Sequence, residues 1–306
     1  MKLVAIVPAT DAPATLDRCM NAIRSALEPP EDVCVIDDPT VQGPARARNL
    51  GAEEASCETL VFVDADVEVH SDAFVRIRRA FEESGDLVAV FGSYDDDPER
   101  HGLVSDFRNL LHHHVHQSGA GPANTFWAGL GAIRRDRFLE IGGFDEARFP
   151  HPSVEDIELG MRIAASGGRI ELDPDLQGKH LKRWTLASMI RTDLSRRGVP
   201  WVRLLLEKQA SSGTLNLGLR HRASAAASVA LVVGLVARRT RVVGAAGLVL
   251  LALNASFYLL LLRRRGLAQA AAGVPLHVLH HIISVAAVPI AVSQYLLARA
   301  GRGEDD

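Results

Sequence analysis

The chain of 306 residues has little net charge and few cysteines, and both features narrow the classes of function that we expect for it. A formal net charge of −3 gives no general reason to expect a nucleic-acid partner. The cysteines show no metal-ligand spacing, so they fit a reduced, cytosolic compartment. A signal peptide is not expected, because only Leu3–Val7 is continuously apolar before Pro8. The cysteines are Cys19, Cys34 and Cys57.

Long stretches of the C-terminal third lack charged residues altogether. Val242–Leu262 has none in 21 positions, enough for a helix to cross a hydrocarbon layer of roughly 30 Å. A buried helix of a soluble protein would show a polar face, and this stretch shows none. Val274–Ala298 is a second uncharged run. Ala223–Ala237, at 15 residues, fits a tilted span, a re-entrant segment or an interfacial helix.

These runs predict two to three transmembrane helices within residues 223–298 and a polar tail at 299–306. Arginines flank every run, so the positive-inside rule does not choose between two and three spans. Before the runs, basic residues interleave with Leu, Ile, Trp184 and Trp201. We expect residues 184–222 to form amphipathic helices at a membrane surface, with a solvated basic helix as the alternative.

The first part of the chain alternates short apolar runs with amphipathic segments. Strands that alternate with helices of about 10 to 15 residues indicate βαβ units and a parallel sheet. Ligands of such sheets bind beyond the carboxyl ends of the strands. The predicted strands are Lys2–Val7, Val33–Ile36, Thr59–Val63 and Leu87–Phe91, and the predicted helices are Thr15–Leu27, Pro44–Ser56 and Ser71–Ser84.

Acidic residues follow the second and third predicted strands. If strand geometry continues through Asp64-Ala65-Asp66, both carboxylates point the same way. Mg²⁺ at phosphate sites takes one or two carboxylates, so the pair fits a divalent cation; a solvated strand end is the alternative. Asp37 or Asp38 fits a hydrogen bond to a nucleobase or ribose. The alternative there is an Asx-turn before Pro39.

Two later segments carry further candidate site residues. The helix that opens at Pro44 places Arg48 near the same edge, where an arginine pairs well with a pyrophosphate; an exposed helix face is the alternative. Glu155 and Asp156 open another helix, and Asp156 fits a general base. Because Ser153-x-x-Asp156 is also a capping-box pattern, a purely structural Asp156 is the alternative.

Glycines and histidines mark two more stretches. In Asn124–Glu146, Gly129 and Gly131 would let the backbone approach a ligand beside Trp127, unless they serve only packing. His112–His116 reads HHHVH, but helical spacing scatters its rings over several faces, so we do not expect a metal cluster there.

The order of these motifs resembles glycosyltransferase family 2 over about residues 1–200. The sequence looks closest to the membrane-attached branch, which includes ceramide glucosyltransferase-like and cellulose-synthase-like enzymes. The resemblance implies an α/β fold of the GT-A (nucleotide-diphospho-sugar transferase) type over residues 1–183. Its mostly parallel sheet would be flanked by helices and followed by interfacial and transmembrane helices.

The resemblance also implies roles for individual residues. Asp156, with Glu155 beside it, takes the position of the catalytic base. Asp66 would hold Mg²⁺ or Mn²⁺, with Asp64 adjacent. His180 stands where the family has Gln or Arg, so it would bind either the metal or the diphosphate. The expected donor-binding residues are Pro8, Thr10, Asp37, Asp38, Arg48, Asp64 and Arg183, and the expected acceptor-binding residues are Trp127, Gly129 and Trp184.

The implied function is inverting, metal-dependent transfer of a sugar from a nucleotide-sugar donor. The acceptor would be a hydroxyl or phosphate of a membrane-associated lipid or lipid-linked molecule. The enzyme would be a multi-pass protein of the inner cell membrane with a cytoplasmic catalytic domain. A non-catalytic nucleotide-sugar-binding membrane scaffold or partner subunit is the alternative. A sugar nucleotidyltransferase is disfavoured, because PATDAPATLD has neither the Gly nor the Lys of a phosphate loop.

Overall fold

The computed structural model describes residues 1–208 and 218–302, and the chain divides into two compact units. The first unit comprises residues 1–100 and 112–183. The second comprises residues 101–111 and the chain from Trp184 onward. The sequence predicts a boundary after Arg183. In the structure, residues 101–111 also belong to the second unit, which the sequence does not predict.

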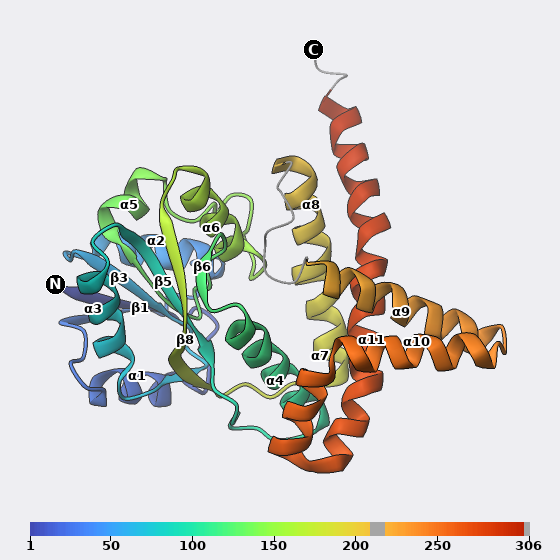
Figure 1. Cartoon of the computed structure of the whole chain (residues 1–306). Coiled ribbons are helices and arrows are strands. Elements are labelled where there is room, and N and C mark those ends of the chain that lie inside the picture. Colours follow the sequence, from blue (N-terminus) through green and yellow to red (C-terminus); the bar gives the residue numbers. More distant parts are fainter. Residues whose placement is uncertain (209–217, 303–306) are drawn as a thin grey trace. The chain divides into compact units, whose positions relative to one another are not determined.

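One sheet forms the centre of the first unit (Figure 1). Its order is β2-β1-β3-β7-β5-β8-β4, and β6 pairs with β8. β1 is parallel to β2 and β3, and β5 is parallel to β8, whereas β7 runs antiparallel between β3 and β5. The strands are β1 (Leu3–Pro8), β2 (Asp32–Ile36), β3 (Thr59–Val63), β4 (Val67–Val69), β5 (Leu87–Tyr94), β6 (Gly121–Ala123), β7 (Leu130–Arg134) and β8 (Arg169–His180).

The α/β architecture is therefore confirmed, with a sheet that is mixed rather than purely parallel. All five residues of β3 are buried, as expected for an apolar run covered on both faces. The ring of Phe62 on this strand lies 5.2 to 6.4 Å from those of Phe126, Phe138 and Phe144. These aromatic contacts join the sheet to the segments that follow β6 and β7.

Helices on both sides of the sheet complete the first unit (Figure 1). α1 turns Cys19, Met20 and Ile23 inward, in agreement with its amphipathic sequence. α4 begins among the residues of the second unit and ends among those of the first. The helices are α1 (Leu16–Ser25), α2 (Gly43–Glu54), α3 (Ala73–Glu83), α4 (Leu103–Ser118), α5 (Arg135–Glu140) and α6 (Glu155–Ala165).

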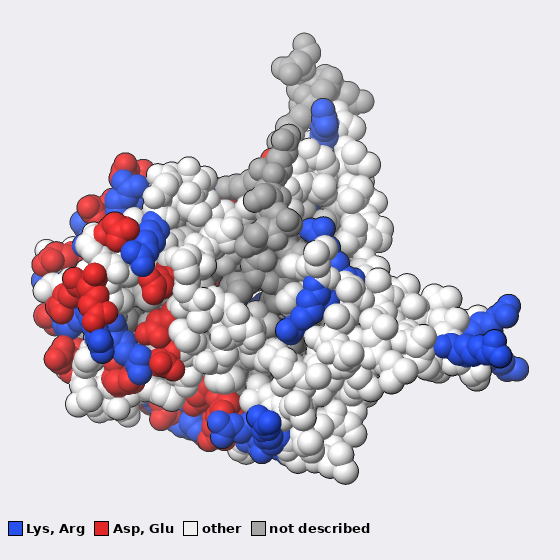
Figure 2. Space-filling model, viewed as in Figure 1, with Lys and Arg blue, Asp and Glu red and all other residues white. Residues whose placement is uncertain are grey.

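The second unit is helical in the residues that the structure describes. Two of its helices, α9 and α11, are long and apolar enough to cross a membrane. Lysine and arginine are sparse on its visible surface except at a few ends, notably at the turn after α9 (Figure 2). Its helices are α7 (Leu186–Arg191), the π-helical η1 (Thr192–Gly198), α8 (Val199–Lys208), α9 (Leu219–Val236), α10 (Thr240–Leu253) and α11 (Ala255–Arg302).

The expectation of one continuous span over Val242–Leu262 is wrong. The helix ends at Leu253, and a new one starts at Ala255. Asn254 lies at the break, and its buried amide donates hydrogen bonds of 2.9 Å to the Leu250 carbonyl and to Ser224 Oγ on α9. Such a side chain competes with the backbone for hydrogen bonds and interrupts the helix. The short Ala223–Ala237 run instead lies in the 18-residue α9.

A buried ion pair anchors η1 within the second unit. The Asp193 carboxylate lies 3.2 Å from Arg108 and 2.9 Å from His280 Nδ1. Burial opposes ionisation of Asp193, but Arg108 and His280 outweigh it and lower the pKa of Asp193 to about 2. Arg108 also lies over the ring of Trp184, 5.1 Å from its centroid. The start of α4 is thus fixed to the segment that follows β8.

Candidate active site

The acidic turn Asp64-Ala65-Asp66 lies between β3 and β4, at the carboxyl end of β3. Strand geometry ends at Val63, so the side chains of Asp64 and Asp66 do not follow the alternation of a strand. Each carboxylate has its own partners. Backbone hydrogen bonds hold the turn from both sides: Asp64 N donates to Gly129 O at 3.0 Å, and Leu181 N donates to Asp66 O at 2.8 Å.

Asp64 faces Arg48 from α2. Arg48 Nη2 donates to Asp64 Oδ1 at 2.6 Å, and Nη1 donates to Glu155 Oε1 at 3.1 Å. Burial raises the pKa of Asp64, and the Arg48 guanidinium opposes part of that shift. The sequence suggested that Arg48 pairs with a pyrophosphate, but the structure places its guanidinium in a buried bridge between two carboxylates.

Asp66 faces His180 at the end of β8. Asp66 Oδ2 lies 3.7 Å from His180 Nε2. Burial works against the charge on Asp66, but His180 and Lys182 outweigh it and lower the pKa of Asp66. The His180 ring stacks on Tyr94, with centroids 4.1 Å apart and planes at 20°. Asp66 and His180 are therefore brought together, as the predicted metal assignment requires.

The candidate base, Asp156, lies in the first turn of α6. Its carboxylate accepts hydrogen bonds from Ile157 N at 2.8 Å and Ala128 N at 3.3 Å. Val154 occupies the N-cap of α6 without a side-chain capping hydrogen bond, so Ser153 is not the N-cap residue that the capping-box alternative expects. Glu155 is buried instead and accepts from Ser153 N at 2.8 Å. Glu155 is thus an anchor of the helix start, and Asp156 is the more accessible of the pair.

Gly129 adjoins Trp127 and leaves no open approach at that point. A side chain at Gly129 would collide with the Trp127 indole, so the glycine makes room for the ring. Gly131 similarly makes room for Phe126. Trp127 is 9% exposed and contacts Tyr94 edge-on, with centroids 4.8 Å apart. Packing, the alternative interpretation of these glycines, accounts for their local geometry.

Other predicted donor residues lie at the ends of β1 and β2. Pro8 ends β1 and Thr10 follows it, half-exposed. Asp38 accepts from Thr40 N and Oγ1 at 2.8 and 2.7 Å, which is the Asx-turn of the alternative interpretation. These hydrogen bonds lower the pKa of Asp38. Asp37 is exposed beside it and is the better placed of the two for a nucleoside.

Arg183 ends the first unit and Trp184 begins the second. Trp184 N donates to Ser105 Oγ at 2.9 Å, a contact within the second unit. The assignments of Arg183 to the diphosphate and of Trp184 to the acceptor therefore stay predictions.

The structure adds an aromatic group that sequence reasoning missed. His112 and His116 occupy one face of α4, with ring centroids 3.9 Å apart, and His112 lies 4.7 Å from Trp127. Tyr94 contacts His112 as well as His180. The expectation that the HHHVH rings scatter is therefore wrong for this pair. Their i, i+4 spacing was the available signal, because such residues share a helix face.

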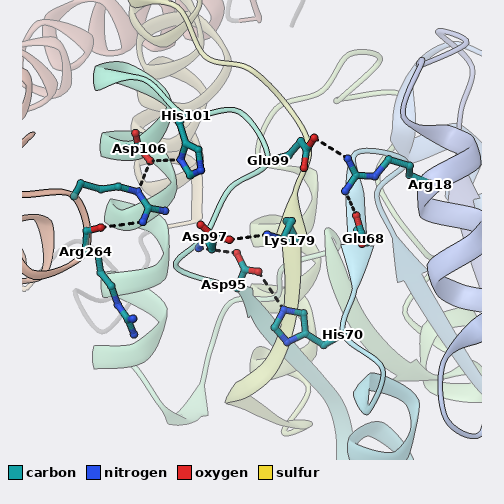
Figure 3. A network of polar contacts seen from close by, with 11 residues as sticks. Arg18, Glu68, His70, Asp95, Asp97, Glu99, His101, Asp106, Lys179 and Arg264 are labelled. Atoms are coloured by element: carbon teal, nitrogen blue, oxygen red, sulfur yellow. Dashed lines mark hydrogen bonds and ion pairs between the residues drawn. The ribbon is translucent and has the colours of Figure 1, made fainter.

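Ion pairs hold the loop after β5 beside this site (Figure 3). Arg18 of α1 contacts Glu68 and lies 2.9 Å from Glu99. Lys179 lies 2.8 Å from Asp97. The backbone N–H of Glu99 donates to the carbonyl of His180 at 3.0 Å. The loop that leaves Tyr94 is thus tied to β4, which directly follows Asp66, and to β8, which ends at His180.

No three His, Cys, Asp or Glu side chains of the described residues gather as a self-sufficient metal site. Cys19 lies behind the acidic turn, with its Sγ 3.5 Å from Asp64 O. Burial, and to a lesser extent Asp64 and Asp66, raises the pKa of Cys19 to about 12. The thiol therefore stays protonated, and a metal ligand would have to be a thiolate.

Comparisons with known proteins agree with this geometry. The family described as Glycosyl transferase family 2 matches residues 17–142. The chain is 26% identical over 174 residues to N-acetylgalactosaminyltransferase 7 of Drosophila melanogaster, covering 49% of this chain and 29% of that protein. The chain thus spans less than a third of that relative.

One solved structure shares the fold. The mannosyltransferase PcManGT of Pyrobaculum calidifontis, in complex with GDP-Man and Mn²⁺, aligns with a TM-score of 0.54 at 16% identity, over 96% of this chain and 87% of that one. TarS of S. aureus aligns with a TM-score of 0.47 at 14% identity, over 93% and 90% of the two chains.

The mixed sheet, with an acidic turn at the end of β3, defines the first unit as a GT-A fold. Residues 17–142, less than half of the chain, match the model of glycosyltransferase family 2. The expected fold is confirmed.

The hydrogen-bonded pair His70–Asp95 should make the stability of the fold depend on pH. The hydrogen bond that His70 makes to the Asp95 carboxylate, at 3.1 Å, raises the pKa of His70. A raised pKa contributes stability that is present below the unfolded value near 6.5 and is lost as pH rises through the folded value. We expect His70→Gln to lower the thermal midpoint more at pH 5.5 than at pH 8.5. Because His70 is 40% exposed, the difference should stay below about 1 kcal/mol.

Asp95→Asn serves as the matched variant, since it removes the same pair from the other side. It should abolish the pH dependence of the His70→Gln effect. An equal loss of stability at both pH values in His70→Gln would contradict the assignment.

Proposed function

We propose that this nucleotide-sugar-dependent glycosyltransferase transfers its sugar with inversion to a membrane-associated lipid or lipid-linked acceptor. One observation carries the proposal: Arg48 contacts both Asp64 of the acidic turn and Glu155 at the start of α6. Residues expected to bind the donor and the residue expected to act as base therefore converge on one edge of the sheet. Asp37 at the end of β2 would contact the nucleoside.

The residues present fit a divalent cation at Asp66 and His180. Carboxylate and imidazole are both ligands that Mn²⁺ accepts, and Mg²⁺ or Mn²⁺ commonly completes its coordination with waters and substrate phosphates. Asp64 is engaged by Arg48, so it would act mainly through its charge. A bound cation would supply charge neutralisation for the departing nucleoside diphosphate. PcManGT binds Mn²⁺ together with GDP-Man, which supports this assignment.

Asp156 is the proposed general base. Its carboxylate would take the proton from an acceptor hydroxyl as the hydroxyl oxygen bonds to the anomeric carbon. The bond from that carbon to the diphosphate breaks in the same displacement, and the nucleoside diphosphate leaves. The N–H groups of Ala128 and Ile157 hold the carboxylate in orientation. An acceptor phosphate, being already ionised, would need no base.

The long apolar helices of the second unit support a lipid acceptor. α9 and α11 are long enough to span a bilayer, and exposed apolar side chains such as Val236, Leu248 and Leu297 cover the C-terminal helices. Exposed arginines follow α9 at positions 238, 239 and 241, where they would meet lipid phosphates. We place the enzyme at the inner cell membrane with its catalytic unit cytoplasmic.

The alternative is a nucleotide-sugar-binding membrane subunit without catalysis. A panel of nucleotide sugars with Mn²⁺ distinguishes the two, because the subunit would bind a donor without hydrolysing or transferring it.

The base assignment predicts that Asp156→Asn abolishes transfer and leaves donor binding intact. Asparagine keeps the shape and one of the two accepted hydrogen bonds but cannot take a proton, and loss of a general base costs roughly 10²–10⁴-fold in rate. Initial rates and the affinity for the nucleotide sugar measure the two effects. Asp136→Asn is the matched control, since Asp136 lies in the first turn of α5 and likewise accepts the N–H of the next residue, at 2.7 Å. Wild-type turnover in Asp156→Asn would remove it from the base role.

The metal assignment predicts that Asp66→Ala weakens binding of Mn²⁺ and of the metal-dependent donor. Calorimetric titration with MnCl₂, with and without GDP or UDP, measures the loss. Glu68→Ala, two residues along on β4, is the control and should titrate like the wild type. Full activity of the unmodified enzyme in excess chelator would contradict the metal assignment of Asp66.

The acceptor assignment predicts a glycolipid that depends on this protein. Mass spectrometry of lipid extracts should show a hexose-bearing lipid in cells that express the wild type and not in cells that express Asp156→Asn. If both extracts are identical while purified enzyme transfers sugar to a soluble acceptor, the lipid assignment is wrong.

A further inference from the structure

Arg48 is the buried cation between the two acidic motifs of the first unit. Its side chain is only 5% exposed, and Ala45, Ala47, Gly51 and Ala52 of the same helix are buried with it. The guanidinium reaches Asp64 with one nitrogen and Glu155 with another, and it lies 5.4 Å from the centroid of the Phe144 ring. Both polar contacts go to carboxylates of the protein.

These contacts join segments that are far apart in the chain. Asp64 is 16 residues from Arg48, and Glu155 is 107 residues away. Glu155 in turn accepts from Ser153 N with its other oxygen, which fixes the loop entering α6. Because Asp156 is the next residue, the position of the base depends on the position of Glu155. One side chain therefore spans the distance between the acidic turn and the base.

Burial makes this bridge sensitive to a change of either partner. Glu155 is 6% exposed, so removing its partner would leave a charge with little access to water. Burial alone would lower the pKa of Arg48. The negative charges of Asp64, Glu155 and Asp156 outweigh this effect and raise the pKa, so the guanidinium stays protonated. A lysine keeps the charge but presents a single nitrogen, whereas the planar guanidinium serves two carboxylates at once.

We propose that Arg48 is a positioning residue that holds the start of α6, and with it Asp156, in register with the acidic turn. In this role it acts through protein carboxylates and does not contact the diphosphate of the donor. The inference rests on the proposed function, which makes Asp156 the base. It departs from the donor-binding role that the family resemblance implied for Arg48.

The test compares Arg48→Lys, Glu155→Gln and the double variant in the full-length enzyme. Initial rates are measured with the active nucleotide sugar, and the affinities for GDP and UDP are measured with Mn²⁺. Arg48→Lys should lower turnover about 100-fold, as expected for a small misplacement of a catalytic group. Nucleotide affinity should stay at the wild-type value. Glu155→Gln should reproduce this split, and the double variant should lose no more than Arg48→Lys alone.

Arg46→Lys is the matched control. Arg46 lies two residues earlier on α2, is 42% exposed and pairs with Glu146 at 3.1 Å. Its replacement should change neither turnover nor nucleotide affinity. Should Arg48→Lys fail to fold, Glu155→Gln carries the same test, because glutamine keeps the shape and an acceptor oxygen.

Three outcomes would overturn the inference. A loss of nucleotide affinity in Arg48→Lys that matches the loss of turnover would place Arg48 on the donor. Unchanged turnover with a lower thermal midpoint would make the bridge only structural. Additive losses in the double variant would separate Arg48 from Glu155. If the wild-type protein processes no donor, the proposed function is wrong. In that case the affinities for GDP and UDP, together with the coupling of Arg48→Lys and Glu155→Gln in thermal stability, still test the inference.

Discussion

The compensation of buried carboxylates by Arg48 is the interaction on which the candidate site depends. Asp64 and Glu155 come from segments that meet only in the folded state, and each approaches the same guanidinium. Without a cation between them, two carboxylates in this partly dry environment would repel each other and resist ionisation. The charge of one side chain thus permits an acidic edge, and an acidic edge is what a metal-dependent nucleotide site requires.

The sheet provides the rigid frame for this edge. β7 runs antiparallel between β3 and β5, so its beginning meets the end of β3. Gly129 O, just before β7, accepts from Asp64 N, and β8 ends at His180 opposite β4. Reversal of one central strand therefore delivers the Trp127 segment to the acidic turn. A wholly parallel sheet would carry that segment to the other end.

The second unit obeys a different constraint. Its helices expose leucine and valine, while some of its buried polar groups pair with one another, as Asp193 does with Arg108 and His280. Asn254 shows the same rule, since its amide satisfies Leu250 O and Ser224 Oγ within the unit. Helices that satisfy their polar groups internally are suited to lipid.

Local patterns in the sequence determined the first strands and helices (β1 to β3, β5 and α1 to α3), the acidic turn after β3 and the apolar character of the C-terminal third. Periodicity and composition carry such information because they act over a few residues. Only the tertiary structure decided that Arg48 faces two carboxylates, that Gly129 accommodates Trp127, that His112 and His116 join an aromatic group with Tyr94, and that Asn254 divides an uncharged run. The contacts of Arg48 with Glu155 and of Asn254 with Ser224 join residues distant in the chain, and no local pattern encodes such contacts.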